Sequence, residues 1–281
     1  YNTAGLYTVT LTVTNDAAGV AVATNSDYIA VWGTYAYVAP SSPSPAEPYH
    51  TWANAAHSIA DAVNGAPAGA TVVVSNGTYN ITQQVEVDEA ITVVSYGAGV
   101  YGGLANASNT VVQRSSGTLR IFEVTDGGAV LDGLTLRNGI GRGDGGWNGN
   151  GVYMANGCTV KNCIIKDNGT SGDASHLYGG GVHMTSGLLS NCVVQANNTG
   201  GGNSPGGGIY ASGGLITHCR VLNNTTLGGY GGGGIYASSS SVLIRNCLIT
   251  GNTTIVRGGG VHGGTVESST IVDNTVTGTN P

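Results

Sequence analysis

Gly206-Gly207-Gly208-Ile209-Tyr210 is one copy of a motif that recurs along the second half of the chain. Further copies begin at Gly179, Gly232 and Gly258, which gives steps of 27, 26 and 26 residues, and a degenerate copy begins at Gly149. A motif that returns with a period in the twenties is typical of a solenoid, in which each repeat forms one coil stacked on the last.

A second motif occurs once in each repeat, with the form apolar-x-x-Cys-x-apolar-x-x-Asn. Its copies contain Cys163 and Asn168, Cys192 and Asn197, Cys219 and Asn224, and Cys247 and Asn252, followed by a copy with Ser269 and Asn274. Short apolar-alternating stretches separated by turns predict strands, so the repeat predicts a parallel β-solenoid. Coils of such a solenoid lie about 4.8 Å apart, which places equivalent residues in ladders.

The two ladders have different interpretations. An asparagine at each bend can bond the backbone and the asparagine of the next coil, as stacked amides do in cross-β structures. We favour this structural role over glycosylation of sequons such as Asn168-Gly169-Thr170. The cysteines could form a disulfide stack or a metal site, but their inward position and the serine at position 269 favour small buried core residues.

The composition excludes several classes of protein. The 281 residues include 49 glycines, and charged residues make up 9%, which argues against a helical protein. A net charge of −6 with two lysines argues against a nucleic-acid partner. No apolar run reaches the 18 or more residues of a membrane span, so we expect no membrane insertion.

The first 38 residues have another pattern. Residues 6–14 alternate apolar and polar side chains, and 20–24 and 28–32 are two further predicted strands. The run from Ala4 to Asn15, with Gly19 and Tyr28-Ile29-Ala30-Val31, resembles the second half of a PKD domain, an immunoglobulin-like β-sandwich of extracellular proteins. The resemblance implies a partial sandwich over residues 1–38, whose missing strands lie upstream or in another copy.

The remaining boundaries follow from composition and spacing. Four prolines predict a stiff linker over residues 39–50. Apolar residues at helical spacing predict a helix over residues 51–65, which we expect to cap the first coil of a β-helix over residues 66–281. Early strands are predicted at 71–74, 91–94 and 111–112.

The repeats also resemble a known family. Asn162-Cys163-Ile164-Ile165-Lys166-Asp167-Asn168 is similar to the coils of the right-handed parallel β-helix of the pectate-lyase-like superfamily, and in particular to its repeat-rich bacterial surface proteins. The resemblance implies an all-β fold and a right-handed solenoid. This fold carries both structural proteins and enzymes, so function must be argued from a site.

One candidate site is a ligand-binding stripe. The residue after each Val or Ile of the glycine motif is expected to face outward, and these residues are Tyr153, His183, Tyr210, Tyr236 and His262. An exposed aromatic row can lie under sugar rings. The alternative is cross-coil stacking that stabilises the sheet.

Candidates for catalysis are fewer. Asp132, Arg137 and Asp144 lie in an earlier stretch that also holds Glu123 and Arg120, and this is where chemistry is expected if the chain is an enzyme. Solvated surface charge is the alternative that we favour. The sequence predicts no cofactor and no metal ligand set, and Ca²⁺ binding at the loops is left open.

Together these features predict a secreted, extracellular or cell-surface protein with a structural or adhesive role. Its expected partners are copies of itself, in filaments or head-to-tail assemblies, or surface and matrix glycans. One alternative is a polysaccharide lyase or glycoside hydrolase of the pectate-lyase-like fold. Another is a carbohydrate-binding module without turnover.

Overall fold

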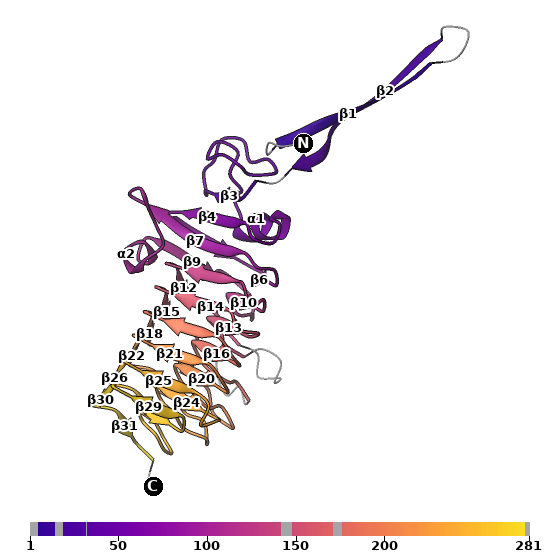
Figure 1. The fold of residues 1–281 in the computed structure, drawn as a ribbon. Helices are drawn as coiled ribbons and strands as arrows, with labels where there is room; N and C mark the ends of the chain where they lie inside the picture. Colours follow the sequence, from indigo (N-terminus) through magenta and orange to yellow (C-terminus); the bar gives the residue numbers. More distant parts are fainter. Residues whose placement is uncertain (1–4, 15–18, 32, 142–147, 171–175, 279–281) are drawn as a thin grey trace.

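The computed structural model describes residues 5–14, 19–31, 33–141, 148–170 and 176–278. A long stack of parallel coils forms most of the molecule, and an antiparallel hairpin extends from its N-terminal end (Figure 1). The predicted all-β parallel solenoid is therefore confirmed. No helix in these ranges is long and apolar enough to cross a membrane.

Four parallel sheets run along the solenoid. The seven-stranded sheet contains β6 (Val85–Val87), β10 (Phe122–Val124), β13 (Val152–Met154), β16 (Val182–Met184), β20 (Ile209–Ala211), β24 (Ile235–Ala237) and β28 (Val261–His262). The eight-stranded sheet contains β5 (Gly77–Ile81), β9 (Thr110–Arg114), β12 (Thr135–Arg137), β15 (Ile164–Lys166), β18 (Val193–Gln195), β22 (Arg220–Leu222), β26 (Leu248–Thr250) and β30 (Thr270–Val272).

The other two sheets complete the coils. The ten-stranded sheet contains β3 (Tyr35–Val38), β4 (Thr71–Ser75), β7 (Thr92–Gly97), β11 (Val130–Asp132), β14 (Thr159–Lys161), β17 (Leu188–Ser190), β21 (Leu215–Thr217), β25 (Leu243–Arg245) and β29 (Thr265–Glu267), with β8 (Val100–Tyr101) paired to β7. The four-stranded sheet contains β19 (Asn198–Thr199), β23 (Thr225–Thr226), β27 (Thr253–Thr254) and β31 (Thr275–Val276). The predicted early strands are β4, β7 and part of β9.

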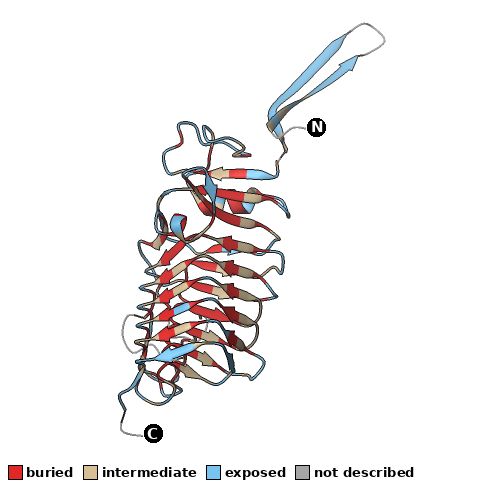
Figure 2. Cartoon of the chain, turned by 60° about the vertical axis from the view of Figure 1, so that its left-hand side comes forward, coloured by how far each residue is buried: buried red, intermediate tan, exposed pale blue. Residues whose placement is uncertain are grey.

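Inward-facing side chains of the sheets form one continuous core (Figure 2). It consists mostly of Val, Ile, Leu, Ala and Cys, and Phe122 and Tyr79 are its buried aromatic residues. Each strand contributes alternate residues, because successive side chains of a strand point to opposite faces. The core therefore extends along the solenoid axis while each coil contacts mainly its neighbours.

The glycine motif turns the chain into the seven-stranded sheet. Its first glycine has a positive φ, 74° at Gly206 and 71° at Gly232, a conformation that favours glycine. The second glycine lies against the next coil, since a Cβ on Gly207 would be 2.5 Å from the carbonyl oxygen of Gly233. Glycine is therefore needed at the first position for the turn, and at the second position for the close approach of two backbones.

The asparagines form the predicted ladder. From Asn197 onward, the Oδ1 atom accepts hydrogen bonds from the backbone N–H and the Nδ2 group of the preceding ladder asparagine, at 3.0 Å and 3.0 Å for Asn224 and Asn197. Asn168, Asn197, Asn224 and Asn252 are buried, whereas Asn274 in the last coil is partly exposed. All five cysteines are free and buried, which supports the core-filling interpretation over the disulfide stack.

Residues that the sequence predicts to form the sandwich and the linker instead cover the N-terminal end of the solenoid. β3 was placed in the sandwich segment, but it pairs in parallel with β4 and begins the ten-stranded sheet. The stretch predicted as a stiff linker is folded against the cap, with Ser42 and Pro48 buried and the Ser44 N–H donating to the carbonyl of Ala53 at 3.2 Å. Both predictions were wrong because backbone hydrogen bonds, rather than local composition, decide where these residues lie. β3 pairs with β4, and the predicted linker bonds to Ala53 and Asn54 of the cap.

The capping helix is also shorter than predicted. α1 spans Ile59–Gly65 and begins after Ser58, whose side chain accepts a hydrogen bond from the Asp61 N–H. The segment before it cannot be helical, because Ala56 exchanges backbone hydrogen bonds with the end of β3. Trp52 instead packs between Tyr37 and Tyr96, with ring centroids 4.5 and 5.6 Å away. A second short helix, α2 (Leu104–Ala107), lies beside β7 and β9.

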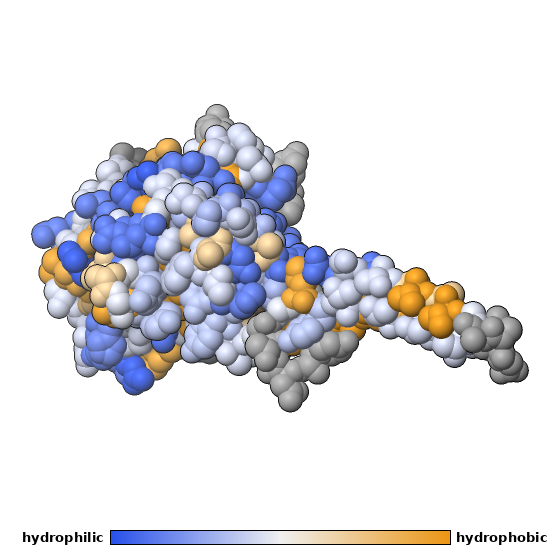
Figure 3. All heavy atoms as spheres, turned by 90° about the horizontal axis from the view of Figure 1, so that it is seen from above, coloured by the Kyte–Doolittle hydropathy of each residue, from blue (hydrophilic) through white to orange (hydrophobic). Residues whose placement is uncertain are grey.

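The hairpin consists of β1 (Gly5–Thr14) and β2 (Val20–Val31), paired antiparallel. The two strands predicted at 20–24 and 28–32 are thus one strand as far as Val31, because β2 continues to pair with β1 past an irregularity between Tyr7 and Val9. Apolar side chains are exposed on the hairpin (Figure 3). They include Leu11, Val13, Val20 and Val22, each at least 55% exposed.

Candidate functional site

A single file of side chains runs along the outside of the seven-stranded sheet. The middle residues of β10, β13, β16, β20 and β24 are in register with one another, with Glu86 of β6 and with His262 of β28. We call this the outer file, and its members are Glu86, Glu123, Tyr153, His183, Tyr210, Tyr236 and His262. All five residues predicted for the ligand-binding stripe belong to it.

Rings of the outer file stack on one another. The ring centroids of Tyr210 and Tyr236 are 5.7 Å apart with an interplanar angle of 7°, and those of Tyr236 and His262 are 4.9 Å apart at 29°. Tyr178, from the loop before β16, stacks on Tyr210 at 4.9 Å and 19°. Spacings in this range are those of favourable aromatic pairs, so the file stabilises the sheet through cross-coil contacts.

His183 differs from the expectation that it faces solvent. Its side chain is covered by Tyr153, Tyr178 and Tyr210, whose ring centroids lie 5.2, 6.1 and 4.9 Å from its own, and the residue is 8% exposed. Burial, together with a smaller effect of the positive charge of Arg120, lowers the pKa of His183 to about 4. His183 is therefore a neutral imidazole at neutral pH, and its Nδ1 has no hydrogen-bond partner among the described residues.

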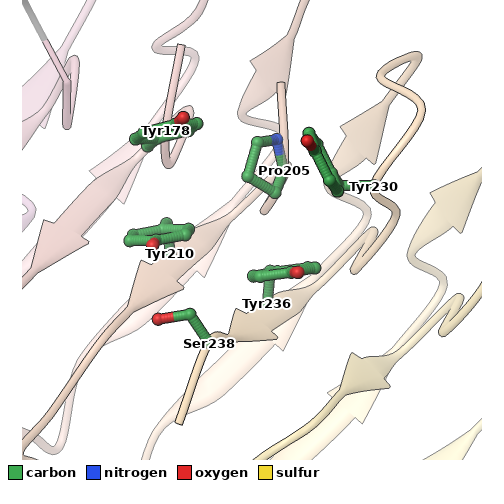
Figure 4. A pocket seen from close by; sticks show the side chains of 6 residues that line it. All are labelled: Tyr178, Pro205, Tyr210, Tyr230, Tyr236 and Ser238. Atoms are coloured by element: carbon green, nitrogen blue, oxygen red, sulfur yellow. The ribbon is translucent and has the colours of Figure 1, made fainter. Parts of the chain in front are cut away.

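A pocket of about 180 Å³ opens beside the stacked rings. Tyr178, Pro205, Tyr210, Tyr230, Tyr236 and Ser238 line it (Figure 4). Tyr210 and Tyr236 come from the outer file, whereas Tyr178, Pro205 and Tyr230 come from the loops that lead into the glycine motifs. Sequence reasoning missed these loop residues, although Tyr178 and Pro205 directly precede the glycine triplets.

The other end of the outer file is acidic. Gln84 donates from Nε2 to Glu86 Oε1 and to Glu123 Oε2, at 2.8 Å in each case, so the two carboxylate oxygens are no more than twice that distance apart. Arg120 forms a 3.4 Å ion pair with Glu123, and its guanidinium lies 4.9 Å from the centroid of the Tyr153 ring. Glu86 was missed in the sequence because its coil matches the repeat loosely.

The structure does not gather the predicted catalytic residues. Asp132 lies on β11 and accepts hydrogen bonds from the Gly103 N–H and from Asn162 Nδ2, at 3.1 and 2.6 Å, in addition to a 3.4 Å ion pair with Lys161. Arg137 lies on a different sheet, in β12, and donates from Nε to Gln113 at 2.7 Å. Asp144 lies outside the described residues. These contacts tie Asp132 to the following coil and Arg137 to the preceding coil.

Metal binding has no support in the described ranges, where no three His, Cys, Asp or Glu side chains form a group that could hold an ion.

Comparison with known proteins identifies the family. Residues 121–280, more than half of the chain, match the family model described as right handed beta helix region, and the chain belongs to this family. A search of curated proteins found no match. A solved structure of the pectin methylesterase from Aspergillus niger is similar over 89% of this chain and 88% of that chain, with 12% identity and a TM-score of 0.43.

Proposed function

We propose that this β-helix is an extracellular adhesive scaffold that binds glycans without cleaving them, through the aromatic pocket beside the outer file. The observation that carries the proposal is the position of the aromatic residues. Phe122 and Tyr79 are the aromatic residues of the described core, whereas Tyr178, Tyr210, Tyr230 and Tyr236 surround one surface pocket. Tyrosine clusters that are apolar on one side and wet on the other are typical of binding surfaces.

The experiment is binding to a glycan microarray that includes plant, algal and bacterial polysaccharides. Tyr236→Ala and Tyr230→Ala should each reduce retention of the bound glycan at least about tenfold, as loss of a hot-spot aromatic residue does. Tyr101→Ala is the matched control, because Tyr101 is an exposed tyrosine on β8, in a different sheet. Unchanged retention in both pocket variants, or absence of any bound glycan, would reject the proposal.

A second candidate function is glycoside hydrolysis at the acidic end of the outer file. Retaining glycosidases use two carboxyl groups about 5–5.5 Å apart. Glu86 and Glu123, in register on adjacent coils and bridged by Gln84, are compatible with that separation. Release of reducing ends from a bound polysaccharide, abolished in Glu86→Gln and in Glu123→Gln, would establish hydrolysis and replace the non-catalytic proposal.

We extend the proposal to the hairpin as one part of a PKD-like sandwich. A two-stranded hairpin alone is marginally stable in water, and β1 and β2 expose apolar side chains on both faces. A hairpin from a second copy of the chain would cover these faces. Light scattering and electron microscopy of the chain with and without Leu11→Lys and Val13→Lys test this pairing, which predicts assemblies that the substitutions disperse.

A further inference from the structure

We infer that the pocket accepts one uncharged terminal sugar ring of a glycan, rather than an internal stretch of the polymer. The inference rests on the proposed glycan-binding function and specifies how the glycan is held.

Stacking of the rings in the outer file covers most of their faces. A sugar ring packs on an aromatic side chain through the face of that side chain. In the outer file these faces are largely directed at other rings, because Tyr210 lies between Tyr178 and Tyr236, and Tyr236 is followed by His262. A polymer that lay along the file would therefore meet ring edges and hydroxyl groups instead of ring faces.

The pocket provides the exception. The rings of Tyr210 and Tyr236 are nearly parallel, yet Tyr236 lies to one side of Tyr210, so part of its upper face is turned toward Pro205 and Tyr230 (Figure 4). Tyr230 stands across this space, at 72° to Tyr236 with their ring centroids 6.4 Å apart. The pocket thus offers one aromatic face, flanked by Pro205 and Tyr230 and open to solvent.

The size of the pocket limits what it can hold. Its volume of about 180 Å³ is smaller than the roughly 300–1,000 Å³ of sites that enclose a drug-sized ligand. This space suits one pyranose ring, and the rest of the glycan would extend into solvent.

The polar groups indicate the chemistry of that ring. None of the described lining residues is charged, and they present four phenol hydroxyls and the Ser238 hydroxyl. Ser238 Oγ donates to the carbonyl of Ala211 at 3.4 Å, which leaves its oxygen able to accept. Hydroxyls that both donate and accept match the hydroxyls of a neutral sugar.

The test is saturation-transfer NMR on the full chain with methyl glycosides of glucose, galactose, mannose, xylose and N-acetylglucosamine. Irradiation of the aromatic protons should transfer signal to the ring protons of at least one of them. Tyr230→Ala, an exposed loop substitution that leaves the sheet intact, should remove the transfer, and Tyr101→Ala should retain it. Removal of terminal residues from an array-positive glycan by exoglycosidases should weaken its retention at least about tenfold.

Failure of this inference differs from failure of the proposed function. If polysaccharides bind and lose retention in Tyr236→Ala, but no methyl glycoside receives signal and trimming has no effect, the pocket does not select chain ends. If no polysaccharide binds, the glycan-binding function itself is wrong.

Discussion

Asn197 Oδ1 accepts two hydrogen bonds from Asn168, one coil earlier, from the backbone N–H at 3.1 Å and from Nδ2 at 3.0 Å. The Nδ2 group of Asn197 in turn donates to the carbonyl of Ile165 at 2.9 Å. Each buried amide therefore satisfies backbone groups of the preceding coil that no water can reach, and its loss should be felt in two coils.

Asn224→Ala should lower the free energy of unfolding by at least about 3 kcal/mol, since each buried polar group left unpaired costs about 1–3 kcal/mol. The substitution removes the acceptor of two Asn197 donors and the donor to the Val194 carbonyl. Chemical denaturation measures the change. Asn223→Gly is the control, because this neighbouring residue is exposed and has Gly251 at the equivalent position in the next coil. Equal losses in the two variants would contradict a special role of the ladder.

Gly207→Ala should destabilise the chain by more than about 2 kcal/mol, because the new Cβ would overlap backbone atoms of both Gly233 and Thr225. Gly201→Ala is the matched control, since no described atom outside residues 200–202 lies within 4 Å of the position its Cβ would take. Its effect should stay within about 0.5 kcal/mol. Thermal unfolding compares the two variants, and a similar melting temperature for both would show that coils can separate to admit a methyl group.

His183 should make stability depend on pH. Its folded-state pKa of about 4 lies below the ordinary value of 6.5 because the ring is buried, so the unfolded chain binds the proton first as the pH falls. The contribution of His183 to the free energy of unfolding is fully present above pH 6.5. It should decline by about 3 kcal/mol as the pH approaches 4. Denaturation curves of the parent chain and His183→Phe at several pH values isolate this part of the pH dependence. The same curves for His262→Phe, at a partly exposed site, should resemble those of the parent chain. A parent-like profile for His183→Phe would contradict the assignment.

The five cysteines should resist alkylation in the folded protein. All five sulfur atoms are buried and therefore inaccessible to the reagent, and burial also raises the pKa of Cys158 to about 11 and that of Cys192, which disfavours their thiolates. Mass spectrometry after iodoacetamide treatment should find no modified cysteine in the native chain and five after unfolding in guanidinium without reductant. Fewer than five modified cysteines in the unfolded chain would mean that cysteines of adjacent coils had formed disulfides.

The repetitive part of the fold could be predicted because each coil repeats the same turn, core position and bend. Gly206, Cys219 and Asn224 mark one turn, one core position and one bend, and the same three features recur in that order in the next coil as Gly232, Cys247 and Asn252. Residues 34–58 could not be predicted in the same way. The periodic apolar residues around Trp52 and Ala56 suggested a helix, but they are apolar because they contact β3 and Tyr96. In a short segment, apolar residues that make tertiary contacts can have the same spacing as the apolar face of a helix.

The tyrosines and histidines of the outer file could be predicted, but Glu86, the burial of His183 and the pocket could not. Alternation along the strand correctly placed Tyr210 and Tyr236 on the outer face of the sheet. The sequence did not reveal that Tyr178 folds over His183, because the position of a loop ring depends on contacts between coils. The same limit applies to Asp132, whose hydrogen-bond partners are Gly103, directly before α2, and Asn162 of the following coil.

Because equivalent residues pair in register from coil to coil, the contact between any two adjacent coils has nearly the same form. Stability in such an array approximates a sum over neighbouring units. Removal of residues 206–231 would join the loop that ends at Pro205 to Gly232 and would place two compatible coils in contact. Gene duplication or deletion in whole coils can therefore change the length of this rod in equal steps without a new core having to evolve.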